Sequence, residues 1–222
     1  TGGSTAYSVD TNTVTITVTA VNDAPVHTVP ATQTIAEEAS LTFSTGNGNL
    51  ISVADLDAGG SSVQFTLTLT NGIATLSTTT GLTFATGDGT ADASMVFTGT
   101  LTNINNALNG MVFDPTADFS GAASLQIRTD DQGNTGSGGV LTDDDTVTIT
   151  VTAVNDAPVH TVPATQTIAE EASLTFSTGN GNLISLADLD AGGSSVQLTL
   201  TLTNGTATLN GTTGLTFATG DG

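Results

Sequence analysis

The carboxylates are the side chains with the clearest chemical potential, because almost no basic residue opposes them. The chain has 222 residues, of which 21 are aspartate or glutamate, and Arg128 is its one lysine or arginine, so the formal net charge is −20. At close range, like charges raise one another's pKa and destabilise a fold. One arginine cannot neutralise so many acids. Calcium can, because it takes six to eight oxygen ligands from carboxylates and carbonyls.

The same composition excludes several classes of partner. Phosphate binding needs clustered cations, so nucleic acid is excluded and anionic lipid surfaces are disfavoured. The absence of cysteine excludes disulfides. No run of about 18 apolar residues occurs, so no membrane insertion is expected. A hydrophobic content of 37% is too high for a disordered acidic tail.

A long internal repeat organises the chain. Residues 13–89 recur as residues 146–222, an offset of 133, and only five of these 77 positions differ. The motif AVNDAP follows the strand-like sequence TVTITVT at both copies, and its proline ends strand pairing. We therefore predict three parts: residues 1–20 as the last strand of a preceding repeat, residues 21–153 as a complete repeat, and residues 154–222 as the first half of the next.

The apolar residues alternate with polar ones, which predicts β-strands. Alternation covers residues 13–19, 63–69 and 146–152, the last with Val147, Ile149 and Val151 facing a core. Asn71-Gly72 is a hairpin signal. Further short strands are expected near residues 41–43, 74–76, 82–84, 95–97, 111–113 and 125–127, with a short helix at residues 103–108. Many short strands between turns predict an all-β sandwich.

Strand direction sorts the acids toward the two ends of the full repeat. If each strand crosses the sandwich, Glu37, Glu38, Asp114 and Asp118 reach the lower end, where residues 153–158 leave. Asp55, Asp57, Asp130 and Asp131 reach the upper end, where residues 20–25 enter, with Asp143, Asp144 and Asp145 near them. Clusters at domain ends favour interdomain calcium. The alternative is that these acids are solvated loop residues that keep the protein soluble.

These motifs together resemble the cadherin-like domains found in tandem in giant bacterial calcium-dependent adhesins. The matching segments are VNDAP, IAEEASLTF, DLDAGG, FDPTADFSG and RTDDQG, and their order spans the whole 133-residue unit. The resemblance implies tandem Greek-key (cadherin/Ig-like) sandwiches with calcium at each junction. It also implies an extracellular, cell-surface or secreted extender module, whose partners are neighbouring repeats, in cell adhesion or biofilm attachment.

The resemblance also implies ligand sets for calcium. At the upper junction they are Asn22, Asp23, Asp55, Asp57 and Asp130 or Asp131. At the lower junction they are Glu37 or Glu38, Asp114, Asp118, Asn155, Asp156, Asp188 and Asp190. The repeat is longer than an animal cadherin domain, and its linker lacks an acid before the asparagine; both departures leave the number of ions open.

Three other functions compete with the adhesin interpretation. An enzyme is not expected, because His27 and His160 are placed at the surface and no tryptophan is present to line a sugar cleft. Calcium-binding glycine-rich nonapeptide repeats are absent as an array. The remaining alternative is a subunit of an extracellular filament or sheath, in which copies of the protein make lateral or strand-exchange contacts.

Residues 154–222 lack counterparts of the later strands of the full repeat. A sheet without those strands exposes an apolar face and an unpaired edge, so this part should be unstable alone. We expect either that the chain continues beyond Gly222 or that another copy supplies the strands, with residues 13–19 as the donor.

Overall fold

The structure is a computed structural model that describes residue 3 and residues 11–222. The chain divides into two compact units, residues 1–154 and residues 155–222.

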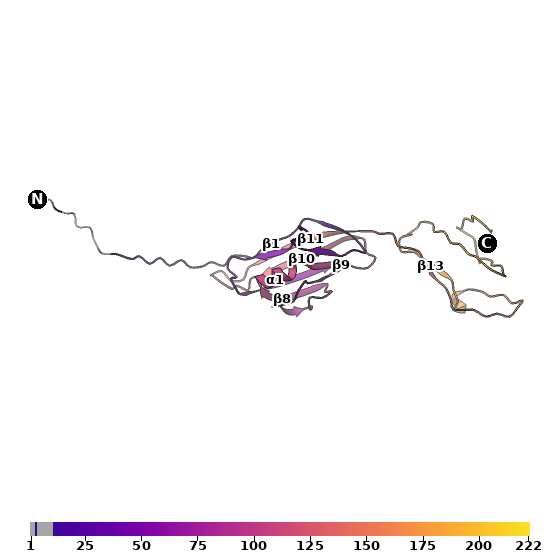
Figure 1. Ribbon diagram of the computed structural model, residues 1–222, viewed down its shortest axis with the longest axis horizontal. Coiled ribbons are helices and arrows are strands. Elements are labelled where there is room, and N and C mark those ends of the chain that lie inside the picture. Colours follow the sequence, from indigo (N-terminus) through magenta and orange to yellow (C-terminus); the bar gives the residue numbers. More distant parts are fainter. Residues whose placement is uncertain (1–2, 4–10) are drawn as a thin grey trace. The chain divides into compact units, whose positions relative to one another are not determined.

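The larger sheet of the first unit has six strands in the order β2-β11-β10-β5-β8-β7. Their bounds are β2 Gln33–Ala36, β5 Ser62–Thr70, β7 Thr83–Thr86, β8 Ser94–Thr100, β10 Gly121–Asp130 and β11 Thr142–Thr152. Figure 1 labels β8, β10 and β11 of this sheet. Neighbouring strands are antiparallel except β11 and β2, which are parallel. The long strands β5, β10 and β11 thus form the centre of the sheet and run the length of the unit.

A second sheet covers one face of the first. It contains β3 Leu41–Phe43, β9 Met111–Pro115 and β6 Gly72–Thr75 in the order β3-β9-β6. A separate antiparallel pair joins β1 Val26–Thr28 to β4 Ser52–Ala54. The helix α1 Leu101–Leu108 begins after Thr100, whose hydroxyl accepts a hydrogen bond from the Asn103 backbone N–H.

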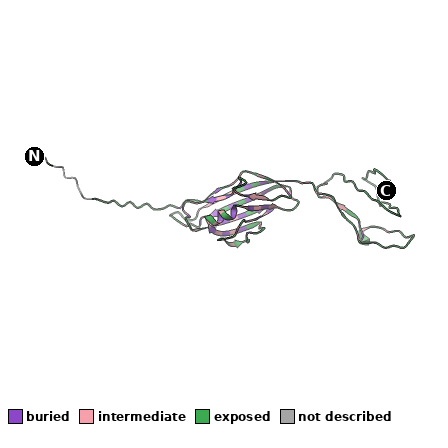
Figure 2. Cartoon of the chain, viewed as in Figure 1, coloured by how far each residue is buried: buried purple, intermediate pink, exposed green. Residues whose placement is uncertain are grey.

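Buried residues from both sheets form one hydrophobic core. Figure 2 shows buried positions in purple along the strands of the first unit. Alternation produces this core, because every second residue of β5 and β8 is buried while its neighbours are not. Fully buried Phe65 and Phe97 come from the large sheet, Phe43 and Phe113 from the small sheet, and Ile104 from α1. The predicted all-β sandwich with a short helix is confirmed.

Strand β11 has the alternation of buried and exposed residues that its sequence predicts. Val147, Ile149 and Val151 are buried, and the residues between them are exposed. The strand pairs with β10 on one side and with β2 on the other. It therefore lies inside the sheet and fills the core with its apolar face, and its alternation predicts the second of these features.

The predicted hairpin at Asn71-Gly72 is wrong, although the turn is present. Asn71 adopts a left-handed conformation with φ 56°, as the turn signal requires. However, β5 before it and β6 after it belong to different sheets. A Cβ on Gly72 would lie 2.3 Å from the Phe113 ring, so glycine allows β6 to pack closely against β9. The turn therefore leads the chain across the sandwich rather than back along one sheet.

Residues 13–19 form no strand, contrary to the sequence-based expectation. Their sequence, TVTITVT, is identical to that of residues 146–152 within β11. Yet Val14, Ile16 and Val18 are 81–88% exposed, and no described strand lies beside them. Alternation supplies the side chains for a strand, but a strand also needs neighbours for its backbone hydrogen bonds.

The second unit repeats only the first pair of strands. Strand β12 Val159–Thr161 pairs antiparallel with β13 Ser185–Ala187 in the register of β1 and β4 shifted by 133 residues. A 3-10 helix, η1, spans Thr178–Asn180. The copy of β5 forms no strand, and its Val196, Leu198, Leu200 and Leu202 are 43–56% exposed. No helix in the described part of the chain has the length and apolar content to cross a bilayer.

Candidate functional site

Three loops meet at the end of the first unit where the chain enters the sandwich. Val21 and Ser137 form an isolated parallel bridge, with Asn22 N–H donating to Ser137 C=O at 3.0 Å and Ser137 N–H donating to Ala20 C=O at 3.0 Å. Gly136 permits this approach, since a Cβ there would lie 2.5 Å from the Asn22 nitrogen. The loop that follows β10 thus holds the segment containing the VND motif.

Asp55 and Asp57 form a tight acidic loop beside that segment. Asp55 Oδ1 accepts hydrogen bonds from the backbone N–H groups of Asp57, at 2.8 Å, and Ala58, at 2.9 Å. The Asp57 carboxylate accepts one from the Asp23 N–H. Asp55 Oδ2 is buried and has no hydrogen-bond partner in the described chain. A buried carboxylate oxygen without a donor is costly, so it needs a cation or water.

Asn22 and Asp131 form a second acidic contact at this end. Asp131 is 1% exposed, and its carboxylate accepts hydrogen bonds from Asn22 Nδ2 and from the N–H groups of Leu141 and Gly133, both at 2.8 Å. Burial alone would raise the pKa of Asp131, but these donors outweigh it and hold the pKa below its ordinary value. Asp131 is therefore charged and fixes the loop, with few lone pairs left for an ion.

The Asp130 side chain stabilises its own turn. Its Oδ1 accepts a hydrogen bond from Gln132 N–H at 2.8 Å, which shapes the turn after β10. The upper-end residues thus lie in linked pairs, Asp23 with Asp57 and Asn22 with Asp131. Within the described residues, no three of their carboxylates bring ligand atoms within 4.8 Å of one another.

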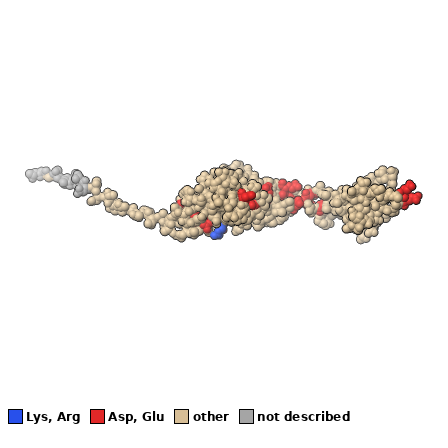
Figure 3. Space-filling model, turned by 90° about the horizontal axis from the view of Figure 1, so that it is seen from below, with Lys and Arg blue, Asp and Glu red and all other residues tan. Residues whose placement is uncertain are grey.

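The predicted lower-end acids gather around one hollow of about 260 Å³. Glu37, Glu38, Asp114 and Asp118 all line it, with Ser40 donating to the Asp114 carboxylate. Glu37 is buried, and its Oε1 accepts a hydrogen bond from Val154 N–H at 2.7 Å, where the chain leaves β11. Figure 3 shows acidic side chains gathered toward this end of the first unit.

The second unit repeats the acidic loop of the first. Asp188 Oδ1 accepts hydrogen bonds from the N–H groups of Asp190, at 3.1 Å, and Ala191, at 2.9 Å. The Asp190 carboxylate accepts one from Asp156 N–H, as Asp57 does from Asp23. The Asn155 side chain donates to the Asp156 carbonyl at 3.0 Å. The loop therefore forms from local sequence even where most of the sandwich is missing.

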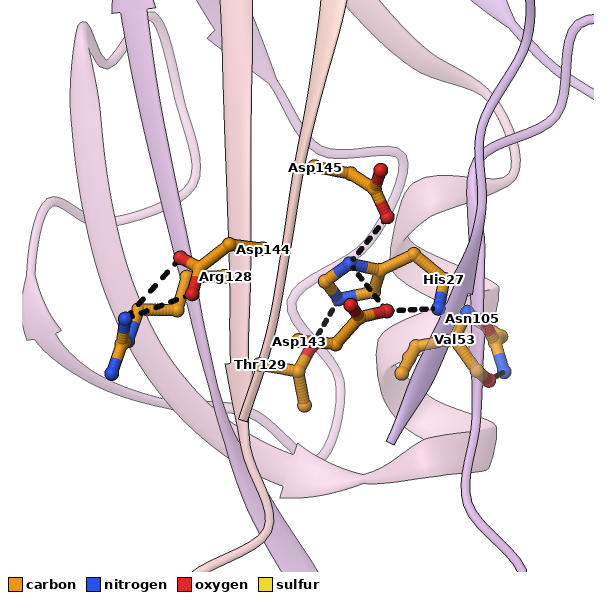
Figure 4. Close-up of polar contacts among 8 residues, drawn as sticks. All are labelled: His27, Val53, Asn105, Arg128, Thr129, Asp143, Asp144 and Asp145. Atoms are coloured by element: carbon orange, nitrogen blue, oxygen red, sulfur yellow. Dashed lines mark hydrogen bonds and ion pairs between the residues drawn. The ribbon is translucent and has the colours of Figure 1, made fainter. Parts of the chain in front are cut away.

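The expectation that both histidines lie at the surface is wrong for His27. Strand β1 places the residue only 8% exposed, while His160 is exposed. The His27 ring stacks edge-on against Phe65 and lies between β1 and the start of β11 (Figure 4). Its Nδ1 lies 3.3 Å from Asp143 Oδ2 and 3.3 Å from Asp145 Oδ2.

The sequence Asp143-Asp144-Asp145 indicates part of this arrangement. Alternate residues of a strand share a face, so Asp143 and Asp145 point one way and Asp144 the other, where it pairs with Arg128 at 2.9 Å (Figure 4). What the sequence did not indicate is that His27, 116 positions earlier than Asp143, lies on their side.

No family model matches the chain, and no curated protein matches it.

Proposed function

We propose that the repeat is a structural extender module of a large extracellular adhesin, without enzymatic activity. Calcium ions bound at its acidic ends stiffen the tandem array and hold an adhesive tip away from the surface of a cell or biofilm. The support is the repeat itself, its resemblance to cadherin-like domains, and the position of its acids where the chain enters and leaves a sandwich.

The observation that carries the calcium proposal is the Asp55 carboxylate. One oxygen orders the loop through two backbone hydrogen bonds, and the other is buried without a donor. Asp57 lies in the same loop, and Asp23 is tied to it from the VND segment. An oxygen-rich site of this kind fits a hard cation such as calcium.

Calcium at this end would stiffen the chain by linking separate segments. The carbonyl and carboxylate groups of residues 20–23 come from the chain that enters the repeat, and Asp55 and Asp57 come from the folded unit. An ion that both segments bind favours the arrangement in which they are held together. The acids around the lower hollow offer an equivalent set where the chain leaves.

The test is thermal melting and small-angle scattering of the full chain with calcium and then with a chelator. We expect calcium to raise the melting temperature. We also expect it to make the chain less flexible, as judged from the scattering profile. At a free concentration 100 times the dissociation constant, the added stability is about 2.7 kcal/mol. Asp55→Asn should remove most of the calcium effect at the upper end.

The matched control is Asp88→Asn. Asp88 also accepts a backbone hydrogen bond in a turn, from Thr90 N–H at 2.9 Å, but it belongs to neither predicted calcium ligand set. The calcium response of the Asp88→Asn variant should equal that of the unmodified chain. If calcium changes neither the shape nor the melting temperature of the unmodified chain, the acids serve solubility alone and the proposal fails.

A filament or sheath subunit is the second candidate, favoured by the unpaired strand sequence. Residues 13–19 carry exposed Val14, Ile16 and Val18, and the same sequence forms a central strand in β11. Strand exchange between copies would bury these side chains. Ultracentrifugation over a range of concentrations tests it: association that Ile16→Lys abolishes supports the filament, and a monomer at all concentrations excludes it.

A further inference from the structure

We propose that His27, Asp143 and Asp145 bind a divalent transition-metal cation of the zinc class. The site lies between β1 and β11 and is separate from the oxygen-only clusters. It involves none of the residues to which calcium is assigned above, so its test does not depend on that assignment.

The ligand atoms converge without any segment having to move. His27 Nδ1, Asp143 Oδ2 and Asp145 Oδ2 all lie within 4.8 Å of one another, and each oxygen is 3.3 Å from the nitrogen. A tetrahedral ion about 2.0–2.1 Å from each ligand places neighbouring ligands roughly 3.3 Å apart. The nitrogen-to-oxygen separations therefore already match one ion between them.

The histidine itself points to a ligand. Its side chain is fully buried, and Nδ1 makes no hydrogen bond within the described chain, although it faces two carboxylates. Nε2 is occupied by a 2.7 Å hydrogen bond with Thr129 Oγ1. When Nε2 carries the ring proton, Nδ1 presents a lone pair to two anions. In that tautomer three electron-rich atoms face one another, and a cation bound among them relieves their repulsion.

The surroundings hold the ligands in place. Thr129 is fully buried in β10 and fixes the far side of the imidazole, as outer-shell partners of metal-bound histidines commonly do. The backbone N–H of His27 donates to Asp143 Oδ2 at 2.7 Å, which orients that carboxylate. Asp143 and Asp145 stand on one face of β11, so the strand sets their spacing. Figure 4 shows both carboxylates directed at the ring.

The ligand set selects the class of metal. Calcium and magnesium favour oxygen ligands, whereas imidazole nitrogen suits zinc, nickel, cobalt and copper. One nitrogen and two carboxylate oxygens leave a position for water or a further ligand on a four-coordinate ion. Zinc would thus bind here while calcium occupies the oxygen-only clusters.

The experiment titrates Co²⁺ into the full chain in saturating calcium, followed by visible absorption, and then displaces it with Zn²⁺. We expect one calcium-resistant site per chain. Nitrogen-15 NMR of the imidazoles should show Nδ1 of His27 perturbed by Zn²⁺ and His160 unchanged. His27→Gln and, separately, Asp145→Asn should each weaken Co²⁺ binding at least about tenfold, since even outer-shell losses commonly cost that much.

The chain supplies two matched controls. His160→Gln alters the same sequence context where residue 160 is exposed, and Asp144→Asn alters the carboxylate that faces Arg128 instead. Neither should change Co²⁺ affinity. If His27→Gln destabilises the fold, the Asp145→Asn variant decides the result. Its fold is verified by circular dichroism. Absence of a calcium-resistant site, or equal binding by the His27 and His160 variants, overturns the proposal.

Discussion

Single residues in this repeat acquire their roles from segments far away in the sequence. His27 and His160 occupy identical sequence contexts, PVHTVP, yet one is buried and the other exposed. The difference arises because Thr129, Asp143 and Asp145 surround only His27. Local sequence therefore could not predict the burial of His27, whereas the acidic loop around Asp55 follows from local turn chemistry and appears in both copies.

Asp131 offers a test of how a buried carboxylate supports the upper end. Asp131→Ala removes the acceptor of the Leu141 and Gly133 N–H groups and of the Asn22 side chain. Buried donors left unpaired cost about 1–3 kcal/mol, so we expect a loss of that size in urea-induced unfolding. Asp130→Ala is the control, because Asp130 is less buried and, among the described residues, its side chain accepts a bond from Gln132 alone. Equal losses for the two variants would contradict this role.

We predict that Thr129 supports metal binding through His27, as an outer-shell residue that does not itself contact the ion. Thr129→Val keeps the shape of the side chain but removes the hydroxyl that bonds His27 Nε2. We expect Zn²⁺ affinity to fall about 10–100-fold, measured by competition with Co²⁺. Thr148→Val is the comparison, since Thr148 lies exposed on β11 and should leave the affinity unchanged.

At the scale of elements, the same seven residues form a central strand at one site and none at the other. Residues 146–152 lie between β10 and β2, whereas residues 13–19 have no described neighbour. Period-two alternation therefore predicted which residues can form strands. It did not predict pairing, which is why the turn at Asn71-Gly72 joins two sheets and why β11 pairs parallel with β2.

This duplication provides a matched pair of substitutions. Ile149→Ala removes a fully buried side chain and should cost about 2–5 kcal/mol of unfolding free energy. Ile16→Ala changes the same residue in the same heptapeptide, but Ile16 is 81% exposed, so the change should stay within about 0.5 kcal/mol. Urea titrations of both variants measure the difference. A large loss for Ile16→Ala would show that residues 13–19 pair in solution.

The loop after β10 can be tested through its glycines. Gly136→Ala would bring a Cβ within 2.5 Å of the Asn22 nitrogen, so the bridge between Val21 and Ser137 should open. We expect weaker calcium binding at the upper end, measured by calorimetry. Gly139→Ala is the control: its φ is also positive, at 81°, but no atom lies within 4 Å of an added Cβ. Equal calcium affinities would show that the bridge does not support the site.

At the scale of the whole molecule, one 133-residue repeat is the length of chain that forms a hydrophobic core. The first unit buries residues from both sheets and α1, whereas among residues 155–222 only Asn182 is buried. The reason is pairing: β5 lies between β8 and β10, and both follow residue 89 in the sequence. The second copy within these 222 residues reaches the equivalent of Gly89, and within it only β12 and β13 pair as strands.

We expect equivalents of the later strands of the first unit to order residues 155–222. A chain extended after Gly222 by a copy of residues 90–152 supplies the equivalents of β8, α1, β9, β10 and β11. Residues 195–203 should then become a central strand, and their amide hydrogens should exchange far more slowly, as measured by mass spectrometry. An extension with residues 90–141 alone lacks β11, so it should give weaker protection because β10 would remain an unpaired edge. If residues 195–203 stay unprotected with the full extension, the core does not depend on these pairings.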